Sequence, residues 1–130
     1  MIRALVVDDE PLARDVLRFF LDDEPDVLLV GESANGREAA AAIRQEEPDL
    51  VFLDVRMPDQ SGLDVIAEIG PENMPAVIFV TAFDEHAVEA FELHAVDYLL
   101  KPVAEERLRQ AVARARERFR LRQIEDAAGQ

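Results

Sequence analysis

The sequence predicts an α/β domain of (βα)5 architecture, a doubly wound parallel five-stranded sheet with helices on both faces. The expected strands are short runs rich in Val, Ile, Leu and Phe, at residues 5–7, 27–30, 50–53, 77–80 and 98–100. Strands buried on both faces give such continuous apolar runs, and the segments between them have the period of a helix. A length of 130 residues fits one domain of this kind.

Two of the expected helices have clear apolar stripes, and two others have capping signals. The first helix follows Pro11, a residue favoured in the first turn. The stripes consist of Ala13, Val16, Leu17, Phe20 and Leu21 in the first helix, and of Leu108, Val112, Ala115 and Phe119 in the last. Ser61 followed by Asp64 predicts a capping box for the third helix, and Asp84 is expected to cap the fourth.

The charge of the chain is acidic and unevenly distributed. Twenty-eight acidic and 14 basic residues give a net charge of −14. Residues 1–102 carry −16 and residues 103–130 carry +2, and all seven bases of the second segment are arginines. An acidic domain repels polyanions, so we expect no direct binding to nucleic acid and none to an anionic membrane.

Composition also suggests a compartment and a boundary. The chain has no cysteine, no secretory leader and no apolar run of membrane-spanning length, which favours a cytoplasmic protein. Residues 1–122 are expected to form the domain. Residues 123–130 lack apolar periodicity, which predicts a frayed C-terminal tail or the start of a linker to a missing effector domain.

The most informative residues directly follow the apolar runs. Asp8 and Asp9 follow the first run, Asp54 the third, Thr81 the fourth and Lys101 the fifth. Ligands of open α/β sheets bind beyond the carboxyl ends of the strands. We therefore expect three carboxylates, a hydroxyl and an ammonium group to meet at one edge of the sheet.

This set of groups suits phosphoryl transfer. Three converging carboxylates repel one another, and a hard divalent cation such as Mg²⁺ relieves the repulsion. We expect Asp8 and Asp9 to face the metal and Asp54 both to coordinate it and to attack phosphorus. Lys101 and Thr81 would then contact the other oxygens of the transferred group.

The motifs around these residues resemble the receiver domain of two-component response regulators, the CheY-like domain with a flavodoxin-like fold. They are Asp8-Asp9, the segment DVRMPDQSG at residues 54–62, Thr81-Ala82 and Lys101-Pro102, within a match over about residues 2–120. The resemblance implies strand order 2-1-3-4-5 and Asp54 as the phosphoacceptor. It also implies a Mg²⁺ site made by Asp8, Asp9, Asp54 and the main-chain carbonyl of Arg56.

The same resemblance implies two further pairs of functional residues. Thr81 and Tyr98 correspond to a coupled switch that reports phosphorylation. Arg56 and Phe83 correspond to side chains that flank the path of the water molecule that removes the phosphoryl group. Neither is an acid or an amide able to hold that water in line, so we expect slow autodephosphorylation.

Residues 81–91 and 95–102 carry a narrower resemblance, to the receivers that precede LytTR-type DNA-binding domains, the group of LytR and AlgR. It implies control of transcription through an output domain absent from this chain. The alternative is a stand-alone receiver that acts by protein–protein interaction.

A sensor histidine kinase or a small phosphodonor is the expected source of the phosphoryl group, and we expect a switch rather than a turnover enzyme. A phosphohydrolase with an Asp nucleophile would need a second Asp where this chain has Arg56. A module independent of phosphorylation would have lost the acidic pair or Lys101, and neither is lost. A homodimer is expected to use the fourth helix, fifth strand and fifth helix, where arginines of the last helix face acids such as Glu85, Glu89, Glu92 and Asp97.

Overall fold

The computed structural model describes residues 1–129, and its strands pair as one parallel sheet. The strands are β1 (Ile2–Val7), β2 (Val27–Ser33), β3 (Leu50–Leu53), β4 (Ala76–Thr81) and β5 (Asp97–Leu100). Their order is β2-β1-β3-β4-β5, which confirms the predicted topology. Every pairing is parallel, so the carboxyl ends of all five strands lie at one edge of the sheet.

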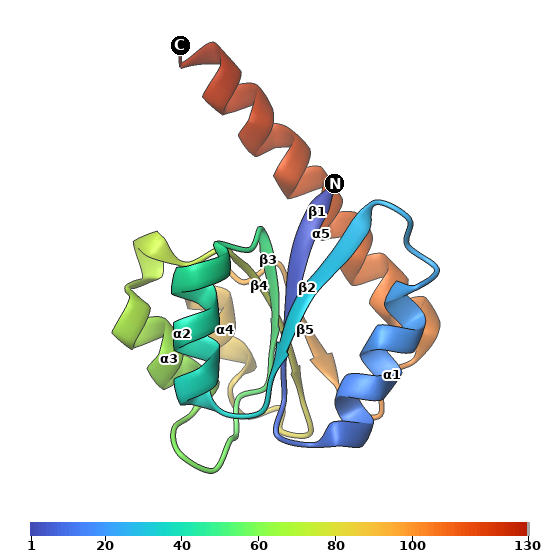
Figure 1. Cartoon of the computed structure of the whole chain (residues 1–130), viewed down its shortest axis with the longest axis vertical. Helices are drawn as coiled ribbons and strands as arrows, with labels where there is room; N and C mark the ends of the chain where they lie inside the picture. The colour runs from blue at the N-terminus through green and yellow to red at the C-terminus, as the bar shows by residue number, and fades with distance from the viewer. Residues whose placement is uncertain (130) are drawn as a thin grey trace.

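Helices cover both faces of the sheet (Figure 1). They are α1 (Pro11–Leu21), α2 (Gly36–Glu46), α3 (Gly62–Ile69), α4 (Ala87–Glu92) and α5 (Glu105–Ala128), with a short 3-10 helix at Pro71–Asn73. Helices α1 and α5 pack on one face, and α2, α3 and α4 pack on the other. This arrangement is the doubly wound fold predicted from the sequence.

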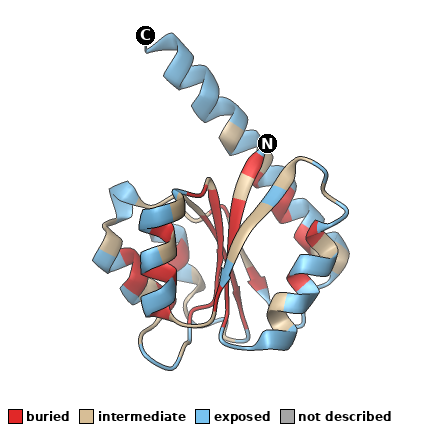
Figure 2. Cartoon of the chain, in the orientation of Figure 1, coloured by how far each residue is buried: buried red, intermediate tan, exposed pale blue. Residues whose placement is uncertain are grey.

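The central strands are buried on both sides, which explains their continuous apolar sequences (Figure 2). In β1, Ala4 and Val6 point to the core under α1 and α5, whereas Leu5 and Val7 point to the core under α2, α3 and α4. Each face thus has its own apolar core. The burial of strand residues on both sides fixes the register of the strands and, with it, the positions of the residues that follow them.

Of the two predicted caps, one is confirmed and one is wrong. Ser61 accepts a hydrogen bond from the backbone N–H of Asp64, whose side chain accepts one from the N–H of Ser61, so the capping box of α3 is complete. Helix α4 instead begins at Ala87, after His86. Asp84 contributes only its backbone carbonyl, which accepts from Ala87 N in a turn that precedes the helix.

Helix α5 is longer than expected. It continues to Ala128 and projects beyond the sheet (Figure 1), where its exposed end carries no packed face (Figure 2). The expectation of a frayed end is therefore wrong for residues 123–128, because backbone hydrogen bonds can extend a packed helix without apolar periodicity. Gln130 lies outside the described residues, and a linker beyond residue 122 stays a prediction.

Within residues 1–129, no helix combines the length and the apolar character needed to cross a membrane.

Candidate functional site

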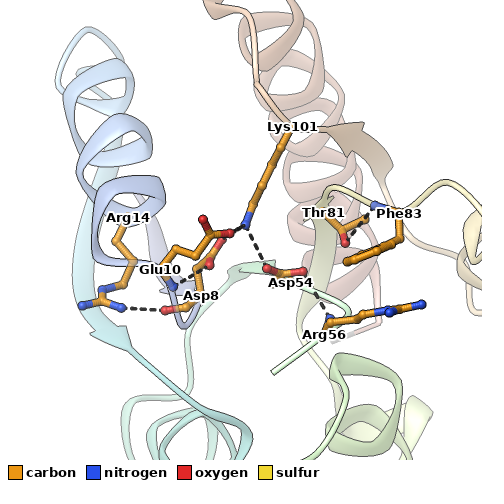
Figure 3. Close-up of polar contacts among 8 residues, drawn as sticks. All are labelled: Asp8, Glu10, Arg14, Asp54, Arg56, Thr81, Phe83 and Lys101. Carbon is orange, nitrogen blue, oxygen red and sulfur yellow. Dashed lines mark hydrogen bonds and ion pairs between the residues drawn. The ribbon is translucent and has the colours of Figure 1, made fainter. Parts of the chain in front are cut away.

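The carboxyl edge of the sheet gathers residues that the sequence singles out, among them Asp8, Asp54, Thr81 and Lys101 (Figure 3). Carboxylate oxygens of Asp8, Asp9, Glu10 and Asp54 all lie within 4.8 Å of one another. Asp54 directly follows β3, and its backbone N–H donates to the carbonyl of Val7 at the end of β1, 3.0 Å away. The parallel register thereby brings together acids that are more than 40 residues apart in the sequence.

Lys101 is the cation of this cluster. Its Nζ lies 2.8 Å from Asp8 Oδ2, 2.8 Å from Glu10 Oε1 and 2.9 Å from Asp54 Oδ2. Burial lowers the pKa of Lys101, but these three contacts outweigh burial and raise the pKa above the ordinary value of a lysine. The Lys101 ammonium in turn holds the pKa of Glu10 below its usual range. Lys101 is therefore charged and placed directly at Asp54.

Glu10 is a member of the site that the sequence reasoning missed. It follows the acidic pair directly, and a third consecutive acid before Pro11 was the available signal. Its distance from Lys101, which is 91 residues further along the chain, could be known only from the fold.

Asp8 carries a buried carboxylate oxygen that lacks a well-aligned hydrogen-bond donor within residues 1–129. Its side chain is 1% exposed, and its Oδ2 accepts no well-aligned hydrogen bond from the described residues. Burial raises the pKa of Asp8, and the nearby Lys101 ammonium only partly offsets this effect. A buried carboxylate oxygen without a well-aligned donor, next to two other carboxylates, is a chemical environment that a hard divalent cation would complete.

The loop between β1 and α1 is held in place by Arg14. Its Nη1 donates to the backbone carbonyl of Asp8 at 2.6 Å, and its Nε lies 3.5 Å from Glu32 Oε1 at the end of β2. The backbone N–H of Glu10 donates to Asp8 Oδ1. These contacts fix the direction in which the acidic loop presents its side chains.

The loop between β3 and α3 packs tightly against the backbone of Asp54. A Cβ atom at Gly62 would lie 2.4 Å from the carbonyl oxygen of Asp54, so only glycine fits there. Asp59 in the same loop accepts hydrogen bonds from the N–H groups of Gly36 and Arg37 at the start of α2. The loop is thus tied at both sides, and the Arg56 carbonyl, a predicted metal ligand, belongs to this segment.

Thr81 and Tyr98 are connected through the backbone of Phe83. The backbone N–H of Phe83 donates a hydrogen bond to Thr81 Oγ1, with an N–O distance of 3.4 Å. The Tyr98 hydroxyl donates to the backbone carbonyl of Phe83. Thr81 is completely buried, whereas Tyr98 packs at the edge of the core, with its ring 5.8 Å from that of Phe79. Thr81 and Tyr98 therefore bind the backbone of the same residue, Phe83.

Arg56 and Phe83 form a pair next to Asp54. The guanidinium carbon of Arg56 lies 3.8 Å from the centre of the Phe83 ring, in cation–π geometry. Arg56 Nη2 is also paired with Glu85 at 2.7 Å. The two residues for which the family resemblance implies a place beside the path of water are thus in contact with each other (Figure 3).

Comparison with known proteins agrees with this geometry. The family model described as the response regulator receiver domain matches residues 4–113. The transcriptional regulatory protein BtsR of Escherichia coli K12 is 50% identical over 117 residues, which cover 90% of this chain and 49% of BtsR. A response regulatory protein of Shewanella oneidensis is 48% identical over 116 residues, or 89% of this chain and 49% of that protein. The chain spans about half the length of these curated relatives.

Solved structures show the same fold. The response regulatory domain of mrkE from Klebsiella pneumoniae superposes with a TM-score of 0.85 at 30% identity, covering 92% of this chain and 99% of that domain. The REC domain of AraT from Geobacillus stearothermophilus gives a TM-score of 0.85 at 34% identity, covering 94% and 98%.

The contact at Gly62 yields a prediction for stability and for the site. Gly62→Ala forces the added methyl group against the Asp54 carbonyl, and we expect a loss of about 1–3 kcal/mol in the free energy of unfolding. Urea unfolding measures the loss, and the amide shift of Asp54 should move with it. Gly31→Ala is the control, since its added Cβ meets only Leu5 Cδ1 at 3.4 Å. Equal effects of both substitutions would contradict this account of Gly62.

Proposed function

This chain belongs to the response regulator receiver family, and we propose that it is a phosphorylation switch in which Asp54 accepts the phosphoryl group. The observation that carries the proposal is the position of the Asp54 carboxylate, 4% exposed as a residue and bound to Lys101 at the edge of the sheet. Such a group is accessible from only one side. It is also surrounded by the charges that phosphoryl transfer requires.

The proposed reaction is a single transfer. A carboxylate oxygen of Asp54 attacks the phosphorus of a phosphohistidine or of acetyl phosphate. An O–P bond forms to Asp54 while the P–N or P–O bond of the donor breaks and the imidazole or acetate leaves. The Lys101 ammonium neutralises negative charge on the transferred group, and the Thr81 hydroxyl donates to another of its oxygens.

Asp8, Asp9, Asp54 and the carbonyl of Arg56 are the residues that would hold Mg²⁺. The buried Asp8 oxygen without a well-aligned donor and the exposed Asp9 carboxylate support this assignment. When bound, the metal supplies positive charge against the oxygens of the phosphoryl group. We propose a switch of this kind in the cytoplasm, in place of an enzyme that turns over substrate.

Helix α1 offers a surface for the proposed kinase. Leu12 and Phe19 are 74% and 70% exposed, and Val16, which is 37% exposed, lies four residues after Leu12 and three before Phe19. Val16 and Leu12 border a cleft that also includes Lys101 and the following Pro102. A partner helix that covers these apolar side chains would place its phosphohistidine close to Asp54.

Transmission of the signal is proposed to use Thr81, Tyr98 and the α4–β5–α5 face. If the phosphoryl group draws the Thr81 hydroxyl away from Phe83, the loop that holds the Tyr98 hydroxyl also changes. Only such differential contacts let phosphorylation shift an equilibrium between two conformations.

The same face is the proposed surface for a homodimer. The sequence predicts ion pairs between the two copies, whereas the structure favours apolar contacts at this face. Asp97 is already paired within the chain, with Arg107 Nη2 at 2.6 Å and Arg114 Nη1 at 3.0 Å. Val88 and Phe91 on α4 are 70% and 84% exposed. An apolar contact between copies, with ion pairs around it, therefore fits this face better than ion pairs alone.

The names of the relatives support a role in transcription, and we propose that this receiver controls a DNA-binding output domain. The LytTR type of that domain rests on the resemblance of residues 81–91 and 95–102. A stand-alone receiver that acts by protein–protein interaction is the alternative. A phosphohydrolase has no support beyond the shared nucleophile.

The phosphoacceptor assignment predicts one labelled residue. Acetyl phosphate with Mg²⁺ should phosphorylate the parent chain, and Asp54→Asn should abolish the labelling because an amide is a poor nucleophile. Mass spectrometry of the intact chain measures the product. Asp126→Asn removes the same charge far from the site and should keep full labelling. Undiminished labelling of Asp54→Asn would refute the assignment.

The coupling of Thr81 to Tyr98 predicts a variant that binds but does not signal. Thr81→Ala should still bind beryllofluoride with Mg²⁺, but the response at Tyr98 should shrink because the link through Phe83 is lost. Tyr98 is the only tyrosine and the chain has no tryptophan, so fluorescence reports this residue directly. A response equal to that of the parent would show that Thr81 is not the source of the change.

The contact of Arg56 with Phe83 predicts a long-lived phosphorylated form. Arg56→Asn combined with Phe83→Glu introduces an amide and an acid that can hold water in line with phosphorus. We expect roughly tenfold faster loss of the phosphoryl group, a modest share of what a positioned acid or base contributes. Decay of the labelled chain measures the rate, with Arg44→Asn as a control remote from the site. A decay no faster than that of the parent would overturn the assignment.

The proposed dimer face predicts a selective effect of charge. Phe91→Asp should shift the beryllofluoride form towards monomer, because it places an acid at the centre of an apolar contact. Phe19→Asp makes the same change on α1 and should leave association unaffected. Sedimentation at low and high salt measures both, and the dimer should weaken only in part at high salt because exposed ion pairs contribute just ~0–1 kcal/mol each. Association that survives Phe91→Asp would place the interface elsewhere.

A further inference from the structure

Lys101 contacts two proposed metal ligands and one carboxylate outside the proposed metal site. Two of its three partners, Asp8 and Asp54, are carboxylates that a divalent cation would also use. The third partner, Glu10, lies outside that proposed metal set. The ammonium group donates hydrogen bonds to Glu10 Oε1 and Asp54 Oδ2, and it lies 2.8 Å from Asp8 Oδ2 without a well-aligned hydrogen bond to that oxygen.

The backbone of Glu10 is held in place by its neighbours. It precedes Pro11, a position that disfavours helical conformation, and it adopts φ −90° and ψ 113°. Its N–H is bound to Asp8 Oδ1 at 3.0 Å. The side chain therefore extends from a fixed point over the acidic loop and reaches Lys101 from the solvent side, with 62% of the Glu10 side chain exposed against 15% for Lys101.

A metal ion and the ammonium group compete for the same oxygens. A divalent cation that draws on Asp8 and Asp54 repels Lys101 and also takes away part of its negative surroundings. Phosphoryl transfer to Asp54 nevertheless requires the ammonium to stay nearby. A carboxylate that belongs to Lys101 alone resolves this conflict.

We propose that Glu10 is a positioning residue that keeps the Lys101 ammonium beside Asp54 when a divalent cation binds Asp8 and Asp54. This role rests on the proposed function of the site. The proposed metal ligands are Asp8, Asp9 and Asp54, and Asp9 has no ion pair among the described residues, whereas the role proposed for Glu10 is its pairing with Lys101 through Oε1.

A single lysine makes the proposal directly measurable. Lys101 is the only lysine in the chain, so ¹⁵N-lysine labelling gives one side-chain ammonium signal in an NMR spectrum. With saturating Mg²⁺ and no phosphodonor, the parent should keep a signal protected from exchange with water, because Glu10 still holds the group. Glu10→Gln should lose that signal on addition of Mg²⁺ and keep it without metal, when Asp8 and Asp54 remain available.

A double-mutant cycle separates positioning from metal ligation. Glu10→Gln should weaken Mg²⁺ binding by about two- to fivefold, because Lys101 then depends wholly on the oxygens that the metal needs. In a Lys101→Met chain, the same substitution should leave the Mg²⁺ affinity unchanged. Glu125→Gln, at the exposed end of α5, is the control for loss of one charge.

The outcomes are distinct. A protected ammonium signal in Glu10→Gln with Mg²⁺, or a loss of Mg²⁺ affinity that persists in the Lys101→Met chain, overturns the proposal, and the second result would show that Glu10 acts on the metal directly, through its charge or as a ligand. Neither measurement uses a phosphodonor, so both stand apart from the labelling of Asp54. Failure of Asp54 labelling with an intact ammonium result would instead reject the proposed function.

Discussion

Repulsion among carboxylates at one edge of the sheet is the constraint on which this structure depends. Asp8, Asp9, Glu10 and Asp54 hold oxygens within 4.8 Å of one another, and the cation placed among them is Lys101. Like charges at such distances are unfavourable unless a counter-charge is fixed nearby. The site is therefore held together by opposite charge, with Lys101 offsetting the repulsion among the acids.

The rest of the fold holds these groups where they are. Two apolar cores fix the register of the strands, so the acids at the ends of β1 and β3 cannot move apart. Gly62 lets α3 start directly against the Asp54 carbonyl, and Asp59 ties the same loop to α2. The loops of the site thus have little freedom, although they lie at the surface.

The fold and the principal site residues were predictable because both follow from local patterns. Apolar runs locate the strands, and parallel topology then brings Asp54 and Lys101 together at one edge. Glu10 was not predictable, since its ion pair depends on two loops that meet only in the folded chain. Asp is a residue type favoured as a helix cap, which is why Asp84 was predicted to cap α4. The turn before α4 instead places His86 at the N-cap position, and no side chain caps this helix. The helical end of α5 was not predictable from apolar periodicity because residues 123–128 have none, and backbone hydrogen bonds continue the helix there.

The projecting half of α5 has a mechanical consequence. The helix has 24 residues and is therefore about 36 Å long, yet only its first half packs on the sheet. Arg107 attaches that packed half to Asp97, the residue before Tyr98. The helix thus projects from an anchor next to Tyr98, and a tilt at the sheet would displace its far end more than its packed end.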